Sequence, residues 1–319
     1  MKTNLYLLLF LVGCTLTTCK LSTYSKYAKG LEEYDMQWDG YKRSYYVHYP
    51  NSRNPQKPAP LLFVLHGGGG TAKGMSGFTF GRFNELAERD SFIVVYPQGI
   101  GKQWNDGRKS DQVKAWKENV DDVGFLVNLV ETLSANYTID QDRVFTCGIS
   151  NGGFMSTRLA CERPDIFRGA AIVTATISED FYPLCNPQQP AAILVMNGTA
   201  DKLVPYEGGP IKVLGKTRGV VLSTDDYVDF WKERNGCRRE LTEVQLEDLQ
   251  DDGTTVSVRK YQDCQEGGSV VLYTVHGGGH TWPGGLQYLG ENLVGKTCRD
   301  IVACDVIWDY FKALKSQTF

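Results

Sequence analysis

The feature that most constrains the fold of this chain is a series of short, unbroken apolar runs separated by segments with helical periodicity. The runs lie at residues 61–65, 92–96, 144–147, 170–173, 192–196 and 270–275, and a further strand is expected at residues 44–49. A strand that is apolar at every position is typical of a parallel sheet, because both of its faces are covered. The pattern therefore predicts a mainly parallel central sheet.

Helical spacing between the runs supports the same fold. Apolar side chains recur every three or four residues at Leu126, Leu129, Val130 and Leu133, and again at Ile307, Tyr310, Phe311 and Leu314. Strands that alternate with helices predict an α/β fold with helices on both faces of the sheet, in a single catalytic domain over residues 34–319. Reactive groups in such folds lie on loops at the carboxyl ends of the strands.

Composition and charge exclude some classes of function. Hydrophobic residues make up 42% of the chain and charged residues 22%, which are ordinary values for a globular protein with a sizeable core. The net charge is −3, and the basic residues are scattered along the chain rather than clustered. Nucleic acid is therefore not expected as a partner, because its binding needs a block of basic residues.

The N-terminus is typical of an export signal, which we place at residues 1–14. Lys2 precedes an apolar run at residues 5–12, and this run is too short for a membrane span of about 20 residues. Residues 11–14 also resemble a bacterial lipobox, so two interpretations stay open: lipidation of Cys14, or ordinary signal cleavage. Contact with a membrane is expected only through such a lipid. Residues 15–33 are expected to form a polar tether.

Cysteine usage agrees with export, because nine cysteines are many for a cytosolic enzyme and no pair has the spacing of zinc ligands. We expect Cys237 to pair with Cys264, since both flank a charged, insertion-like segment at residues 238–263 that a crosslink would fasten. The other expected pairs are Cys298 with Cys304 and Cys161 with Cys185. Cys147 is then expected to be a buried thiol, and no metal site is predicted.

The sharpest local signal is a serine between glycines. Ser150 lies in the segment at residues 148–153, Gly-Ile-Ser-Asn-Gly-Gly, directly after one apolar run and before a helical stretch at residues 154–161. A glycine-rich helix cap would contain similar residues. A tight strand-turn-helix junction, however, needs small neighbours and lifts the serine hydroxyl clear of the sheet, so this context favours a nucleophile. The same turn places the Asn151 N–H at a helix N-terminus, where it can meet an oxyanion.

A nucleophilic serine needs a histidine to take its proton and a carboxylate to orient that histidine. Asp201 follows the run at residues 192–196, and His280 lies in a glycine-rich loop after the run at residues 270–275. Both come in the chain order that an α/β-hydrolase requires. We therefore predict Ser150, Asp201 and His280 as the catalytic triad. His276 is the less favoured histidine because it ends its strand.

Two further features bear on the candidate site: other aspartates that could replace Asp201, and a second glycine cluster. Asp225 and Asp226 are nearby in sequence, but they are expected to cap a helix. Residues 66–70, His-Gly-Gly-Gly-Gly, follow the run at residues 61–65. Glycines there let backbone N–H groups approach a substrate, so Gly68 is predicted as the second oxyanion donor beside Asn151. The cluster lacks the ending of a P-loop, and His66 is expected to be structural.

These motifs together resemble the polyhydroxybutyrate depolymerase-like and feruloyl esterase group, which includes carbohydrate esterase family one. The matching segments are residues 65–70, 96–99, 104–105, 121–125, 148–153, 198–201 and 278–284. The resemblance implies an α/β-hydrolase fold and a secreted esterase that needs no cofactor and acts on acyl groups attached to polymers. One departure is Gly68, where many members of the group carry a cysteine.

The substrate is expected to be a feruloyl or acetyl ester of plant cell-wall polysaccharide. Trp104, Asn105 and Trp282 are predicted to form an aromatic, hydrogen-bonding wall for a feruloyl ring or a sugar, unless they only pack the loops. Hydrolysis of 3-hydroxybutyrate polymers or oligomers is the alternative, and it is less favoured because no polymer-binding module follows Phe319. Peptidase activity is less expected without a gating domain. A non-catalytic carbohydrate-binding protein is the alternative from another class.

Overall fold

The protein is described by a computed structural model that covers residues 27–109, 112–213 and 215–314. The predicted export signal, with Cys14, and most of the predicted tether lie outside the described residues. Within the described residues, no helix has the length and apolar character that a membrane span requires.

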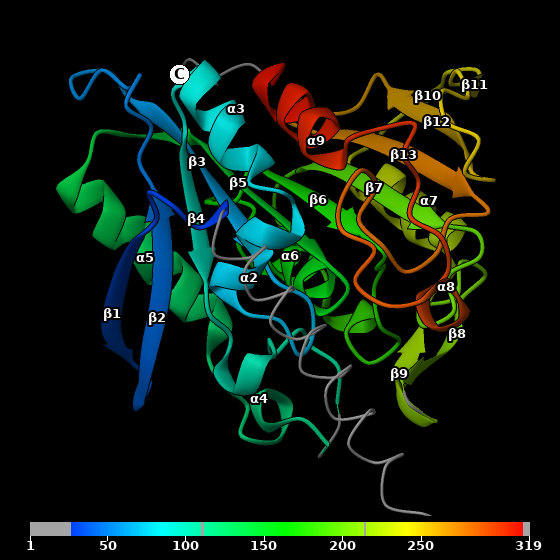
Figure 1. The fold of residues 1–319 in the computed structure, drawn as a ribbon, viewed down its shortest axis with the longest axis horizontal. Helices are drawn as coiled ribbons and strands as arrows, with labels where there is room; N and C mark the ends of the chain where they lie inside the picture. Colours follow the sequence, from blue (N-terminus) through cyan, green and yellow to red (C-terminus); the bar gives the residue numbers. More distant parts are fainter. Residues whose placement is uncertain (1–26, 110–111, 214, 315–319) are drawn as a thin grey trace, which may run out of the picture.

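One large sheet organises the fold (Figure 1), in the order β1-β2-β4-β3-β5-β6-β7-β13-β12-β10, with β11 paired to β12. Its strands are β1 (Glu32–Trp38), β2 (Tyr41–His48), β3 (Ala59–Leu65), β4 (Ile93–Pro97), β5 (Ile139–Ile149), β6 (Gly169–Val173), β7 (Ala192–Gly198), β10 (Arg239–Glu240), β11 (Val244–Gln245), β12 (Thr255–Gln262) and β13 (Ser269–His276). The strands from β4 through β3, β5, β6 and β7 to β13 are parallel. The predicted mainly parallel sheet is confirmed.

Helices cover both faces of this sheet, and each parallel strand buries alternate residues on opposite sides. In β3, Leu62 and Val64 pack toward α2 (Ala72–Phe78), α3 (Arg82–Asp90) and α9 (Ala303–Lys312). Leu61 and Phe63 pack on the opposite face toward α5 (Asp122–Asn136) and α6 (Asn151–Glu162). Two-sided burial explains why the sequence of β3 is apolar without a break.

Smaller elements surround the carboxyl ends of the parallel strands. They are η1 (Ile100–Lys102), α4 (Lys114–Lys117), η2 (Tyr182–Leu184), the two-stranded sheet of β8 (Gly209–Val213) and β9 (Lys216–Val221), and α8 (Glu291–Val294). Helix α7 (Thr224–Arg234) follows β9, and Ser223 is its N-cap, with Asp225 and Asp226 in its first turn. Figure 1 shows β8 and β9 beside the right half of the main sheet and outside it.

The segment at residues 238–263 is part of the main sheet, although its sequence is charged and insertion-like. It contains β12, which pairs with β13 in antiparallel register and buries Val256, Val258 and Tyr261. The burial of β12 is mixed: Ser257 is buried together with these three residues, whereas Lys260 and Gln262 are exposed. Because polar residues interrupt its apolar ones, β12 lacks the continuous apolar run that marks the parallel strands.

Two of the three predicted disulfides are formed, Cys161–Cys185 and Cys237–Cys264, and Cys147 is a buried free thiol as predicted. The predicted pairing of Cys298 with Cys304 is wrong, because both thiols are free. Cys304 is the second residue of α9 and packs in the core cluster with residues of α3, whereas Cys298 packs with Val256 and Val275. The two side chains therefore enter different clusters despite their short separation in sequence.

Candidate active site

Ser150 lies at the sharp turn between β5 and α6. Its backbone has φ 55° and ψ −121°, a conformation that costs free energy for a residue with a side chain. The turn closes because Gly148 and Gly152 touch: a Cβ on Gly148 would lie 2.4 Å from the carbonyl carbon of Gly152. A Cβ on Gly152 would in turn lie 2.5 Å from the carbonyl oxygen of Leu65. Both positions therefore require glycine, and together they bring Ser150 against the end of β3.

The glycine loop after β3 passes beside this turn. Gly69 donates its N–H to the Lys102 carbonyl at 2.8 Å, and Gly70 donates to the Gly67 carbonyl at 3.0 Å. Among the described residues, no hydrogen-bond acceptor is found for the Gly68 N–H. Asn151 is the first residue of α6, so its N–H belongs to the unpaired donors of a helix N-terminus. Both donors border the cavity that contains Ser150, and they can stabilise negative charge there.

The side chain of Asn151 is held in place by hydrogen bonds. Its Oδ1 accepts from the Trp104 N–H at 2.7 Å, and its Nδ2 donates to the Trp104 carbonyl at 3.0 Å and to Asp106 Oδ2 at 2.6 Å. Asp106 is also paired with Arg108, and the side chains of both are nearly inaccessible to solvent. A buried, fully bonded amide fixes the start of α6 and with it the direction of the Asn151 N–H.

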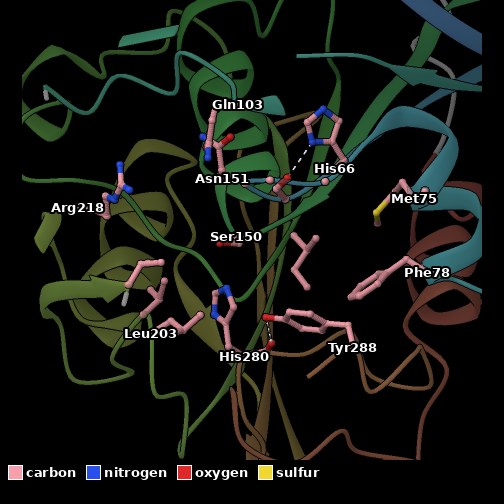
Figure 2. Close-up of a pocket in the computed structure, with 18 of the residues that line it drawn as sticks. His66, Met75, Phe78, Gln103, Ser150, Asn151, Leu203, Arg218, His280 and Tyr288 are labelled. Carbon is pink, nitrogen blue, oxygen red and sulfur yellow. Dashed lines mark hydrogen bonds between the residues drawn. The ribbon is translucent and has the colours of Figure 1, made fainter. Parts of the chain in front are cut away.

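Asp201 and His280 form a buried pair on the other side of Ser150. His280 Nδ1 donates to Asp201 Oδ2 at 2.7 Å, while Asp201 Oδ1 accepts from the N–H groups of Leu203 at 2.8 Å and Val204 at 2.9 Å. The carboxylate is therefore fixed by three donors. Because Nδ1 carries the proton toward Asp201, the unprotonated Nε2 is available to act as a base. Figure 2 shows the His280 ring beneath Ser150 in one cavity.

Tyr288 supports His280 from the apolar end of the cavity, because its hydroxyl donates to the His280 carbonyl oxygen at 3.2 Å (Figure 2). No motif in the sequence marks this residue. It lies eight positions after His280, within a loop that has no helical or strand pattern.

His66 is buried and anchors the glycine loop through hydrogen bonds. Its Nδ1 lies 2.8 Å from the Gly67 carbonyl oxygen, which can only accept, so Nδ1 carries the proton. Nε2 then accepts from the Gly99 N–H and from Gln98 Nε2, each at 3.1 Å. Burial lowers the pKa of His66 to about 4, so the ring is neutral and structural rather than a catalytic base.

The remaining histidines bond elsewhere in the fold. His276 ends β13, and its Nε2 lies 2.8 Å from the hydroxyl of Ser257 on β12. His48 on β2 contacts Glu88 at 3.1 Å. Neither residue lines the cavity of Ser150.

The cavity around Ser150 has a volume of about 820 Å³, which is in the range of sites for small organic ligands. On the side of Tyr288, its lining includes Met75, Phe78 and Leu289. On the opposite side, which includes the β8–β9 hairpin at residues 209–221, the lining residues are Arg108, Val113, Trp116, Leu203, Val204, Ile211, Val213 and Arg218. We call this hairpin the outer wall. Figure 2 shows Arg218 and Leu203 on one side of Ser150, with Phe78 and Tyr288 on the other.

The predicted wall of Trp104, Asn105 and Trp282 is wrong, because none of the three lines the cavity. Trp104 is fully buried, and its Nε1 donates to the His66 carbonyl at 2.9 Å. Trp282 is fully buried in the core against Phe83. Asn105 donates through Nδ2 to the Val120 carbonyl at 2.9 Å. These side chains pack the loops, and the aromatic lining comes from Trp116, Phe78 and Tyr288 instead.

One group of possible metal ligands is found among the described residues: Asp252, Cys298 and Asp300. Asp300 Oδ1 accepts from the N–H groups of Leu249 and Gln250, each at 2.9 Å, and Asp252 Oδ2 accepts from the Arg299 N–H at 2.7 Å. These carboxylates fasten loops by bonding to backbone donors.

Comparisons with known proteins agree with this geometry. The model of the prolyl oligopeptidase family matches residues 80–182, which contain the turn at Ser150. The chain is 30% identical over 282 residues to "Putative esterase NocK" of Nocardia uniformis subsp. tsuyamanensis, covering 85% of this chain and 79% of that protein. It is 27% identical over 244 residues to "Feruloyl esterase B" of Piromyces equi, covering 75% of this chain and 42% of the relative.

A solved structure shares the fold. The acetyl xylan esterase from Aspergillus awamori superposes with a TM-score of 0.56, covering 88% of this chain and 99% of that one. The sequence identity is 13%, so this similarity concerns the fold.

Proposed function

This chain belongs to the α/β-hydrolase esterases related to the feruloyl esterases and is a carboxylic ester hydrolase, and from that premise we propose that it is an exported enzyme that cleaves feruloyl or acetyl esters of plant cell-wall polysaccharide. The observation that carries the proposal is the Asp201–His280 pair, at 2.7 Å, whose histidine lines the same cavity as the strained Ser150. A histidine oriented by a buried carboxylate beside a serine is the arrangement that acyl transfer requires.

In the proposed mechanism, Ser150 Oγ attacks the ester carbonyl while His280 Nε2 takes its proton. The N–H groups of Gly68 and Asn151 stabilise the oxyanion of the tetrahedral intermediate. His280 then gives the proton to the departing alcohol, which leaves an acyl group on Ser150. Water, activated by His280, releases the acid and restores the serine. Asp201 keeps His280 in the required tautomer and stabilises the imidazolium.

The cavity supports a substrate with an apolar part. Its lining includes aromatic side chains on both sides of Ser150, and the cavity is larger than an acetyl group requires. The disulfides Cys161–Cys185 and Cys237–Cys264 support export, because such bonds persist in oxidising compartments.

A hydrolysis panel tests the substrate class. Catalytic efficiencies should be compared for methyl ferulate, acetylated xylan and 3-hydroxybutyrate oligomers. We expect the first two to be cleaved and methyl ferulate to be favoured over a small aliphatic ester by about 10-fold or more, since apolar contacts contribute about 1 to 3 kcal/mol of discrimination. Preferential cleavage of 3-hydroxybutyrate oligomers would replace the proposed substrate with the alternative polyester.

Labelling with a fluorophosphonate tests whether the protein is a catalyst or a carbohydrate-binding protein on a hydrolase scaffold. The probe bonds only to an activated serine, so we expect one adduct, on Ser150. The Ser150→Ala variant is the matched control and should remain unlabelled. An unlabelled wild-type protein that is folded and binds polysaccharide would support the non-catalytic alternative.

A further inference from the structure

The charges that line the active-site cavity are all of one sign. Apart from His66, His280 and Tyr288, the ionisable residues in its lining are Lys73, Arg108 and Arg218, and none of the lining residues is an aspartate or a glutamate. Low-dielectric walls around a cavity of one sign concentrate the electrostatic potential inside it. The cavity is therefore suited to a ligand that carries negative charge.

Arg108 does not supply the free positive charge, because it is neutralised by a buried partner. Its Nε donates to Asp106 Oδ2 at 3.0 Å, and its guanidinium lies 4.6 Å from the centre of the Trp116 ring and 4.4 Å from that of Phe154. Arg108 instead supports the outer wall, since its Nη1 donates to the Arg218 carbonyl at 3.3 Å. Gly219 permits this approach: a Cβ there would lie 3.3 Å from Arg108 Cδ.

Arg218, whose backbone carbonyl is held by Arg108, is the cation of the outer wall that lines the cavity. It is half-buried on β9, and its only hydrogen bond from the side chain within the described residues is a long one, 3.5 Å, from Nη1 to the Gln112 carbonyl. It forms no ion pair with any carboxylate in the described part of the chain, in contrast to Arg43, Arg82, Arg89 and Arg108, which all do. The planar donors of a guanidinium match the two oxygens of a carboxylate, so Arg218 has free hydrogen-bonding capacity for a carboxylate in the cavity.

We infer that Arg218 is a specificity residue that binds a carboxylate carried by the ester substrate, which extends and rests on the esterase function proposed above. The carboxylate can belong to the alcohol half, as in a uronic acid unit of a polysaccharide, or to the acyl half, as in a dicarboxylic half-ester. The chemistry of recognition is the same in both. Lys73 is exposed on α2 and is a second cation of the lining. A variant at Lys73 therefore tests whether the carboxylate is bound at Arg218 or at another positive charge.

Two pairs of synthetic esters distinguish these sources. Acetate esters of 4-hydroxybenzoate, as the free acid and as its methyl ester, place the charge in the alcohol half. Mono-4-nitrophenyl glutarate and its methyl ester place it in the acyl half. The quantity to measure is kcat/KM for the charged ester divided by kcat/KM for its neutral partner, because effects on folding or on the triad cancel in this ratio.

We expect Arg218→Gln to lower this ratio about tenfold for one of the two pairs, and that pair identifies the half that carries the carboxylate. Arg218→Lys, which keeps the charge, should recover part of the loss. Arg163→Gln removes a positive charge outside the cavity and is the matched control, with both ratios expected within twofold of wild type. For the wild type, 0.5 M NaCl should lower the ratio of the same pair, because salt screens a partly exposed charge.

The inference is overturned if Arg218→Gln leaves both ratios within twofold of wild type, or if Lys73→Gln lowers either ratio more than Arg218→Gln does. Failure of the wild type to hydrolyse any of the four esters would count instead against the proposed esterase function. The two failures are therefore distinguishable in one experiment.

Discussion

The two regions that border the cavity are built in different ways. The nucleophile corner (residues 66–70 and 148–153) is packed backbone against backbone, so that a Cβ on Gly148 would meet another residue at 2.4 Å. The outer wall lies outside the main sheet, and a Cβ on Gly209 or Gly215 would meet nothing within 4 Å. The catalytic geometry therefore depends on the fold itself, whereas the wall can change with little effect on the fold.

The largest effect should come from removing the reactive groups: Ser150 in the nucleophile corner, and the histidine and aspartate that act on it. We expect Ser150→Ala and His280→Ala each to lower kcat by about 10⁴ to 10⁶, and the double variant to be little worse, because the two residues act as one unit. Asp201→Asn should lose about 10⁴ through the wrong imidazole tautomer. Steady-state kinetics on an activated ester measures all of these. Near-normal turnover in any single variant would rule out that residue as a member of the triad.

The next effect concerns the packing of the nucleophile corner. Gly148→Ala should reduce the free energy of unfolding by about 3 kcal/mol or more, because the added methyl group has no space. Gly290→Ala is the control: its φ is −61° and a Cβ there would meet nothing within 4 Å, so a loss of at most about 1 kcal/mol is expected. Denaturant unfolding measures both. Equal losses would show that Gly148 is no more tightly packed than a glycine with open space around it.

The pH dependence of stability tests the anchor of the glycine loop. The folded-state pKa of His66 is about 4, below the ordinary value of 6.5, so the unfolded chain binds a proton more readily. The stabilisation is therefore complete above pH 6.5 and is lost as the pH falls to about 4, and it amounts to about 3 kcal/mol. Denaturant unfolding at several pH values should show a smaller loss over this range in His66→Asn than in wild type.

A spectroscopic control keeps this prediction testable if His66→Asn does not fold. The ring resonances of His66 in the wild-type protein should not titrate between pH 8 and 5.5. A midpoint near 6.5 would show that His66 is accessible to solvent and that the glycine loop is not anchored as described.

The smallest effect should come from the outer wall. Val213→Ala, in the cavity lining, should lower kcat/KM for methyl ferulate relative to an acetate ester about 3- to 10-fold, because it removes apolar contact to the larger group. Its effect on the free energy of unfolding should stay within about 1 kcal/mol. Val195→Ala, at a fully buried position of β7, should show the reverse pattern: a larger loss of stability and an unchanged ratio. If both variants behaved alike, the outer wall would be as important to the fold as the core of the main sheet.

Local sequence signals identified the elements of the parallel sheet with small errors at their ends. The strand expected at residues 192–196 is β7, Ala192–Gly198, and the helix expected from residue 154 begins three residues earlier, at Asn151. No continuous apolar run marks strand β12, because polar and charged residues interrupt its valines and its tyrosine. Trp104 and Trp282 were misassigned because an aromatic residue close to a motif in sequence can point either into a cavity or into the core.

The sequence by itself determined the α/β architecture and the residues that the chemistry requires, because two-sided burial leaves continuous apolar runs and because a strained turn needs glycines at fixed positions. Only the tertiary structure decided what surrounds Ser150. Arg108, Val213, Arg218 and Tyr288 come from loops and from a hairpin far apart in the chain, and no local pattern marks them. They meet at the cavity because the parallel sheet brings the loops after its strands to one edge, where contacts between distant segments, rather than neighbours in sequence, set the position of each side chain.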